Sequence, residues 1–183
     1  MIVHTMKSIL TWFFLLPLVL TKAHAQNPFL TLKYDSLVWY DYKGYKGNFD
    51  VIDKSGKLNK SVVKSAVLDA VSAKEFSRRL GLRSSYGQAK AFCFDPHLGI
   101  VYYKAGKAIA TVLICMDCNI LEPSLHLKAQ EQGYDVGGPG NPTGLYTGGG
   151  MSPAFRKYIN SLLIKYRFSH QIDPRGNAID GYH

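Results

Sequence analysis

The chain has 183 residues, of which 46% are hydrophobic, so it can form one domain with a sizeable core and is not globally disordered. Lysine and arginine outnumber aspartate and glutamate by 22 to 13, for a formal net charge of +9. No run of five or six like charges marks a basic or acidic tail.

The first 25 residues have the three parts of a secretory signal peptide. Lys7 supplies a positive charge, Ser8–Thr21 is an apolar run, and residues 23–25 read A-H-A, a small-residue cleavage site. The apolar run is shorter than the roughly 20 residues that a membrane span needs, and Pro17 interrupts it. We therefore expect a cleaved signal peptide and no stable membrane span after cleavage.

Cleavage predicts one mature domain over residues 26–183, located in the periplasm or outside the cell. Only two lysines and no acids are lost, so the mature chain keeps a net charge of +7. An exported protein rarely meets nucleic acid, so we expect no nucleic-acid partner. The charge favours either an anionic cell-surface polymer as partner or a solvated basic surface with no dedicated partner.

The first half of the mature chain reads mainly as strands. Asn27–Gly44 is rich in Leu, Val, Trp and Tyr and predicts one or two strands, broken near Asp35-Ser36. A short strand is expected around Phe49–Ile52, followed by a turn at Lys54–Gly56. The β-branched residues of Ser61–Val71 favour a strand over a helix.

A short helix is predicted over residues 73–80. Ser72 and Glu75 have the spacing of a capping box, in which each side chain bonds to a backbone amide at the helix start. Gly81 supplies the residue type that ends helices in a left-handed conformation.

The clearest helix is C-terminal. Ser152 is a capping residue and Pro153 suits the first turn. One apolar stripe follows at helical spacing, made of Phe155, Tyr158, Ile159, Leu162, Leu163 and Tyr166. We favour packing of this stripe on a sheet over attachment to a membrane surface, because the chain offers little else to cover a sheet.

These elements predict an α+β fold. We expect an antiparallel meander of about five strands, with the C-terminal helix packed on one face and the short helix at its edge. The glycine-rich stretch 131–150 lacks a phosphate-binding motif and is interpreted as a surface loop.

Three cysteines, Cys93, Cys115 and Cys118, are the main chemical signal. A two-residue turn at Ala105-Gly106 places Cys93 opposite Cys118 in a hairpin, within reach of a disulfide. An exported protein keeps such a bond. A bulge would shift this pairing by one residue. We favour a Cys93–Cys118 disulfide.

Two other interpretations stay open. Cys93, His97, Cys115 and Cys118 form a Cys3His set suited to tetrahedral zinc, whereas the favoured interpretation needs no cofactor. Cys115 and Cys118 also form a C-x-x-C pair, as in thiol–disulfide redox proteins. A reactive pair usually opens a helix, and only four residues separate Cys118 from Pro123, which leaves little room for one.

No catalytic motif is present. Asp95, His97, His126 and His170 are available for acid–base chemistry, but they match no known catalytic spacing. We assign no catalytic residue and expect a protein that is not an enzyme.

The segments S-S-Y-G-Q-A-K-A-F-C-F-D-P-H-L-G-I-V-Y-Y and I-C-M-D-C-N resemble an uncharacterised family of small exported bacterial proteins, abundant in Bacteroidetes. Its members carry C-F-x-P-x-x-G-I followed by I-C-x-x-C-N. The resemblance implies export and a shared fold, but no activity. The residues that it marks are Cys93, Phe94, Pro96, Gly99, Cys115, Cys118 and Asn119. The sequence thus predicts an exported, non-enzymatic domain of unknown ligand, stabilised by a cysteine hairpin.

Overall fold

The computed structural model describes residues 27–43, 49–87, 94–131, 150–172 and 178–179. The predicted signal peptide, Cys93 and nearly all of the glycine-rich stretch lie outside these residues.

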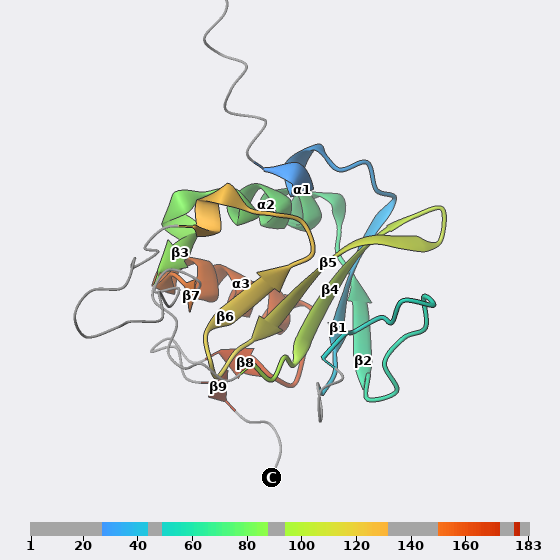
Figure 1. The fold of residues 1–183 in the computed structure, drawn as a ribbon. Coiled ribbons are helices and arrows are strands. Elements are labelled where there is room, and N and C mark those ends of the chain that lie inside the picture. Colours follow the sequence, from blue (N-terminus) through green and yellow to red (C-terminus); the bar gives the residue numbers. More distant parts are fainter. Residues whose placement is uncertain (1–26, 44–48, 88–93, 132–149, 173–177, 180–183) are drawn as a thin grey trace, which may run out of the picture.

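The described residues form one large antiparallel sheet of seven strands, in the order β2-β1-β4-β5-β6-β7-β3 (Figure 1). Its strands are β1 (Ser36–Asp41), β2 (Lys64–Val67), β3 (Tyr86–Gly87), β4 (Leu98–Lys104), β5 (Lys107–Cys115), β6 (Ile120–Pro123) and β7 (Gly150–Met151). The α-helices are α1 (Pro28–Thr31), α2 (Ala70–Leu80) and α3 (Pro153–Lys165). Single 3-10 turns, η2 (Arg83–Ser85) and η3 (Lys128–Gln130), and a small ribbon of β8 (Gln171–Ile172) and β9 (Ala178–Ile179) complete the fold.

This arrangement confirms the predicted α+β class, with a meander of β4, β5 and β6 at the centre. The C-terminal helix also begins as predicted. Pro153 occupies its first turn, and the Ser152 hydroxyl accepts a hydrogen bond from the Phe155 amide. No helix among the described residues has the length and apolar character to cross a membrane.

The second helix starts earlier than predicted. Its cap is Asp69, whose carboxylate accepts a hydrogen bond from the Ser72 amide at 2.9 Å. The capping box expected at Ser72 is therefore wrong. Glu75 instead bonds to the side chains of Arg78 and Arg79, one turn further along the helix. Helix α2 is three residues longer at its start than the predicted 73–80 segment.

Two predicted strands take other forms. The chain after Asn27 folds as the short helix α1 rather than as a strand, since Pro28 is pre-set for a first helical turn. The Asn27 side chain donates to the Ser77 carbonyl and so ties α1 to α2. Near Ile52, the strand reduces to a single bridge to Leu58.

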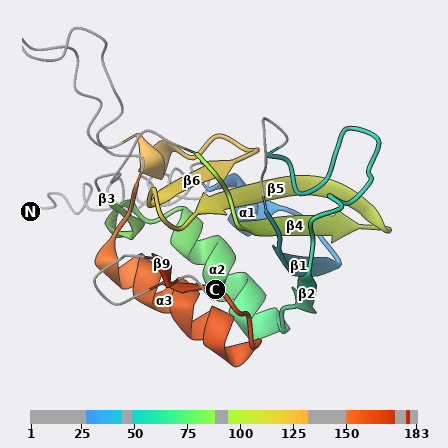
Figure 2. The same cartoon turned by 90° about the horizontal axis from the view of Figure 1, so that it is seen from below.

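One face of the sheet, here called the covered face, carries the main core. Helices α2 and α3 lie side by side beneath it in Figure 2. The rings of Trp39 and Phe76 have centroids 5.4 Å apart, and those of Phe76 and Phe155 are 6.1 Å apart. This contact chain joins β1 to α2 and α2 to α3, so both helices pack on the sheet, α2 included, instead of lying at its edge.

The other face, here called the opposite face, has a smaller core. Tyr42, Val51, Val101 and Leu113 are buried there, beneath part of the 49–63 segment. Val51 lies directly over Gly99, where an added Cβ would come within 2.5 Å of the valine side chain. Gly99 therefore allows this segment to pack on the sheet.

Candidate functional site

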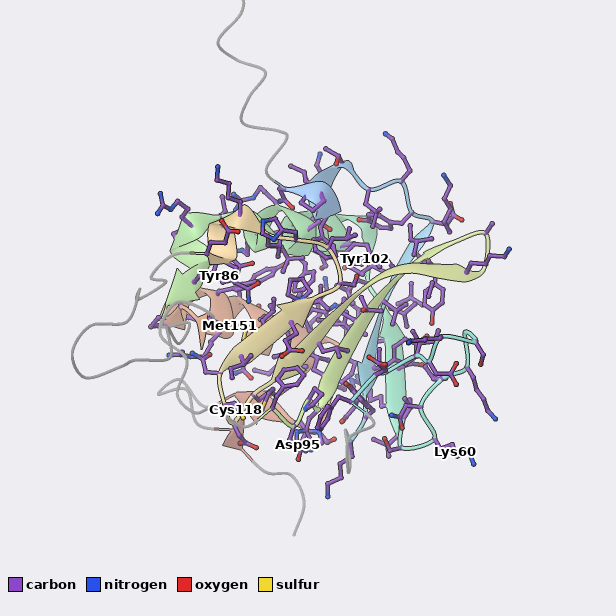
Figure 3. All side chains as sticks on the ribbon, in the orientation of Figure 1. Lys60, Tyr86, Asp95, Tyr102, Cys118 and Met151 are labelled. Atoms are coloured by element: carbon purple, nitrogen blue, oxygen red, sulfur yellow. The ribbon has the colours of Figure 1, made fainter. Side chains whose placement is uncertain are left out.

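The chemistry-bearing residues gather at one end of the sheet, here called the polar end. Two backbone bonds place His97 there: its amide donates to the Ile114 carbonyl at 3.1 Å, and its carbonyl accepts from Tyr42. It thus sits between the end of β1 and the end of β5. Figure 3 shows Asp95 and Cys118 at this same end of the sheet.

Asp41 is the buried centre of the polar end. Its side chain is 1% exposed, as the last residue of β1 on the covered face. One carboxylate oxygen bonds to Nδ1 of His170 at 2.6 Å, and the other accepts from the Ser169 hydroxyl at 2.8 Å. The His170 ring lies 5.4 Å from the His97 ring, between centroids. These contacts anchor the chain after α3 to the sheet.

This Asp–His contact was not foreseen from the sequence. The sequence offers His170 with Asp95, His97 and His126 for acid–base chemistry, and it does not indicate Asp41. The two partners are 129 positions apart, and no local motif links them. Only the topology, which returns the chain to the end of β1, brings them together.

Cys115 and Cys118 lie in and beside the turn that joins β5 to β6. Both are buried, at 0% and 1% exposure, and they are not bonded to each other. The Cys118 amide donates to Cys115 Sγ at 3.3 Å. Strand β6 begins directly after Asn119. The prediction that no helix follows the C-x-x-C pair is therefore confirmed.

Asn119 fastens this turn. It adopts a left-handed backbone conformation, with a φ of 56°, which asparagine tolerates better than most residues. Its side-chain amide donates to the Met151 carbonyl at 3.0 Å, and its own carbonyl accepts from the Met151 amide. The cysteine turn is thereby tied to β7.

Tyr42, on the opposite face, lies near several acidic side chains. Burial raises the pKa of the Tyr42 hydroxyl, and the nearby negative charges of Asp50, Asp95 and Glu122 raise it further. The Tyr42 hydroxyl donates to the Phe49 carbonyl at 2.5 Å. This phenol therefore stays protonated and serves as a structural donor.

The predicted hairpin turn is confirmed at its tip. Lys104 faces Lys107, and Ala105 and Gly106 both have positive φ, at 49° and 75°, as a two-residue type I′ turn requires. A bulge between Tyr102 and Tyr103 then shifts the register by one residue towards the polar end. The unbroken register that set Cys93 opposite Cys118 is therefore wrong.

The zinc set is brought together only in part. His97, Cys115 and Cys118 all lie at the polar end, whereas Cys93 is outside the described residues. In the part of the chain that the structure describes, no three His, Cys, Asp or Glu side chains are placed to hold a metal ion. A site completed by Cys93 stays a prediction, as does the Cys93–Cys118 disulfide.

Comparison with known proteins adds no family. No protein-family model, curated protein or solved structure matches the chain significantly.

Proposed function

We propose that the protein is an exported, non-enzymatic binding domain, in which the polar end stabilises the fold. The observation that carries the proposal is burial: Asp41, Cys115 and Cys118 are each at most 1% exposed. A catalytic thiol needs a partly exposed, electropositive site, and here both cysteines are buried. Buried groups that bond to one another are typical of structural roles.

The Cys93–Cys118 disulfide belongs to this proposal. A bridge between the chain entering β4 and the turn leaving β5 would lock the polar end, and an oxidising compartment would preserve it. The excess of positive charge supports an anionic partner, for which an anionic cell-surface polymer is the sequence-based prediction.

Counting thiols in the mature chain tests the proposal. With a maleimide reagent, we expect no labelling of the folded protein, one labelled cysteine in denaturant without reductant, and three after reduction. In the Cys93→Ser variant, both remaining cysteines should be labelled in denaturant without reductant. Rapid labelling of the folded wild-type protein would show an accessible thiol and contradict the structural role.

A second candidate function is metal binding or thiol redox chemistry at Cys93, His97, Cys115 and Cys118. The hydrogen bond from the Cys118 amide to Cys115 Sγ favours it, because such a bond stabilises the thiolate that binds metals. One zinc ion per chain without a disulfide would support the metal site. A Cys115–Cys118 bridge that exchanges readily with glutathione would support redox chemistry.

A further inference from the structure

Strand β2 forms one edge of the large sheet, with β1 as its neighbour (Figure 1). The outer side of an edge strand presents backbone donors and acceptors to which another extended chain can pair. We therefore asked which groups of β2 face outward and what surrounds them.

The register with β1 identifies these groups. The Leu68 amide donates to the Leu37 carbonyl at 2.9 Å, and Ala66 faces Trp39 two residues along. In an antiparallel ladder, only alternate residues bond to the neighbouring strand. The backbone amides and carbonyls of Ser65 and Val67 therefore point away from β1, towards the outside of the sheet.

Two exposed valines lie near these groups, Val67 on the opposite face and Val63 just before the strand. Val63 is 65% exposed and Val67 is 63% exposed. Val67 pairs with Val38 on β1, so its side chain continues the apolar surface of that face to its margin. A chain that paired with β2 would cover Val67 and pass close to Val63.

Positively charged side chains lie on the covered-face side of β2 and just before its first residue. Lys64 donates from Nζ to the Arg167 carbonyl and lies 5.5 Å from the centroid of the Phe168 ring. Figure 3 shows Lys60 extending outward below β2. Within the described residues, neither Lys60 nor Lys64 forms an ion pair. The edge thus carries positive charge from Lys64, with Lys60 just before the strand.

We propose that β2 is the docking edge for an extended peptide segment of a protein partner, with acidic and aliphatic side chains in alternation. Side chains of a paired strand point alternately to the two faces. Acidic residues would then meet Lys64, and aliphatic residues would meet Val67. The inference rests on the proposed binding function and names a peptide as the partner at this edge, in place of the anionic polymer that the sequence alone predicts.

The observations favour a peptide over the other occupants. An anionic polysaccharide would use the cations but neither the outward amides nor the valines. A second copy of this chain would bring Lys64 close to its own counterpart, and like charges in apposition disfavour such a pairing. Strand addition uses all three features together.

Hydrogen exchange on the full mature chain tests the proposal. The probe is a capped octapeptide of alternating glutamate and valine, and its matched control has lysine in place of glutamate. We expect the glutamate peptide to slow exchange of the Ser65 and Val67 amides at least about tenfold at saturation, since each gains a ladder hydrogen bond. The lysine peptide should leave both amides unchanged.

Substitutions separate the two kinds of contact. The pair Val63→Ser and Val67→Ser should weaken peptide binding about tenfold, because much of the apolar burial is lost. Val71→Ser, at a valine that is 79% exposed on α2, is the matched control and should change binding less than about twofold. Lys64→Gln should weaken binding severalfold, and Lys74→Gln, on the outer side of α2, should not.

Three results would overturn the proposal. The first is absence of protection at millimolar glutamate peptide, and the second is equal protection by dextran sulfate, which indicates a polymer site. The third is protection that rises with protein concentration alone, which indicates a second copy. These results leave the burial of the cysteines untouched, so failure of the docking edge is distinguishable from failure of the proposed function, which thiol labelling reports.

Discussion

The two faces of the sheet differ in how they are filled. On the covered face, aromatic side chains from β1, α2 and α3 form one continuous core that includes Trp39, Phe76 and Phe155. On the opposite face, a loop segment covers a small cluster around Val51, and the hydroxyls of Tyr40 and Tyr103 bond to each other at 2.9 Å nearby.

This difference separates stability from recognition. The covered face buries the large side chains and so supplies most of the free energy of folding. The opposite face can keep exposed residues, such as Val67, at its margin because the fold does not depend on burying them. Substitutions on the two faces should therefore differ in size as well as in kind.

The largest effect is expected at Phe76, which is 0% exposed on the covered face. Phe76→Ala should lower the free energy of unfolding by about 3–5 kcal/mol, because it opens a cavity between Trp39 and Phe155. Urea unfolding of the mature chain measures this. Phe49→Ala, at a phenylalanine 38% exposed on the opposite face, is the control and should cost less than half as much. Equal losses would erase the distinction between the faces.

The next effect concerns the polar end. Asp41→Asn should cost about 2–4 kcal/mol, because it replaces the buried carboxylate that bonds to both His170 and Ser169 with an amide whose NH2 group cannot accept these bonds. Ser169→Ala removes one of these bonds and should cost about 1 kcal/mol. Asp117→Asn, at an exposed aspartate in the cysteine turn, should be nearly neutral. A neutral Asp41→Asn would show that the chain after α3 is held by other contacts.

The sequence correctly predicts the structural features that depend on residues close together along the chain. Helix α3 was found because Ser152, Pro153 and the apolar stripe lie within one segment. The predicted start of helix α2 is wrong because Asp69 and Ser72 are both good capping residues. Asp69 is also held by contacts distant in sequence. Its carboxylate accepts hydrogen bonds from Lys165 and Tyr166, at 2.6 and 2.7 Å, which link α2 to α3.

The polar end was predicted only in part for the same reason. The absence of a helix after Cys118 follows from the nearby Pro123, and the hairpin tip follows from Ala105-Gly106. The contact between Asp41 and His170 depends on the return of the chain after α3, and the bulge at Tyr102 has no local signature. Long-range packing decides both.

A medium effect is expected at Gly99, which Val51 approaches closely on the opposite face. Gly99→Ala should cost about 1–3 kcal/mol, because the new methyl group overlaps Val51. Adding Val51→Ala should cost less in this variant than in the wild type, and a double-mutant cycle measures the difference. Strict additivity would mean that the 49–63 segment does not pack on Gly99, and the opposite face would then be more open than described.

The smallest effect lies outside both cores, at Glu75 on α2. Hydrogen bonds from Arg78, and secondarily from Arg79, lower the pKa of Glu75 to about 2. A carboxyl whose pKa falls on folding stabilises the native state above its unfolded pKa, and this contribution is lost as the pH falls from 4.5 towards 2. Since the pair is partly exposed and screened, Glu75→Gln should cost only about 0.5–1 kcal/mol at pH 7.

Urea unfolding of both proteins at pH 7 and at pH 2.5 measures the Glu75 contribution, and the difference between them should shrink at the lower pH. Glu122→Gln is the control on the opposite face. There, desolvation raises the carboxyl pKa, so ionisation of Glu122 opposes folding as the pH rises. Its removal should therefore be neutral or stabilising at pH 7. If both substitutions changed the free energy of unfolding in the same direction, the environments of the two carboxyl groups would not differ as described. Glu75 bonds to two arginines on α2, whereas Glu122 is desolvated on the opposite face of the sheet.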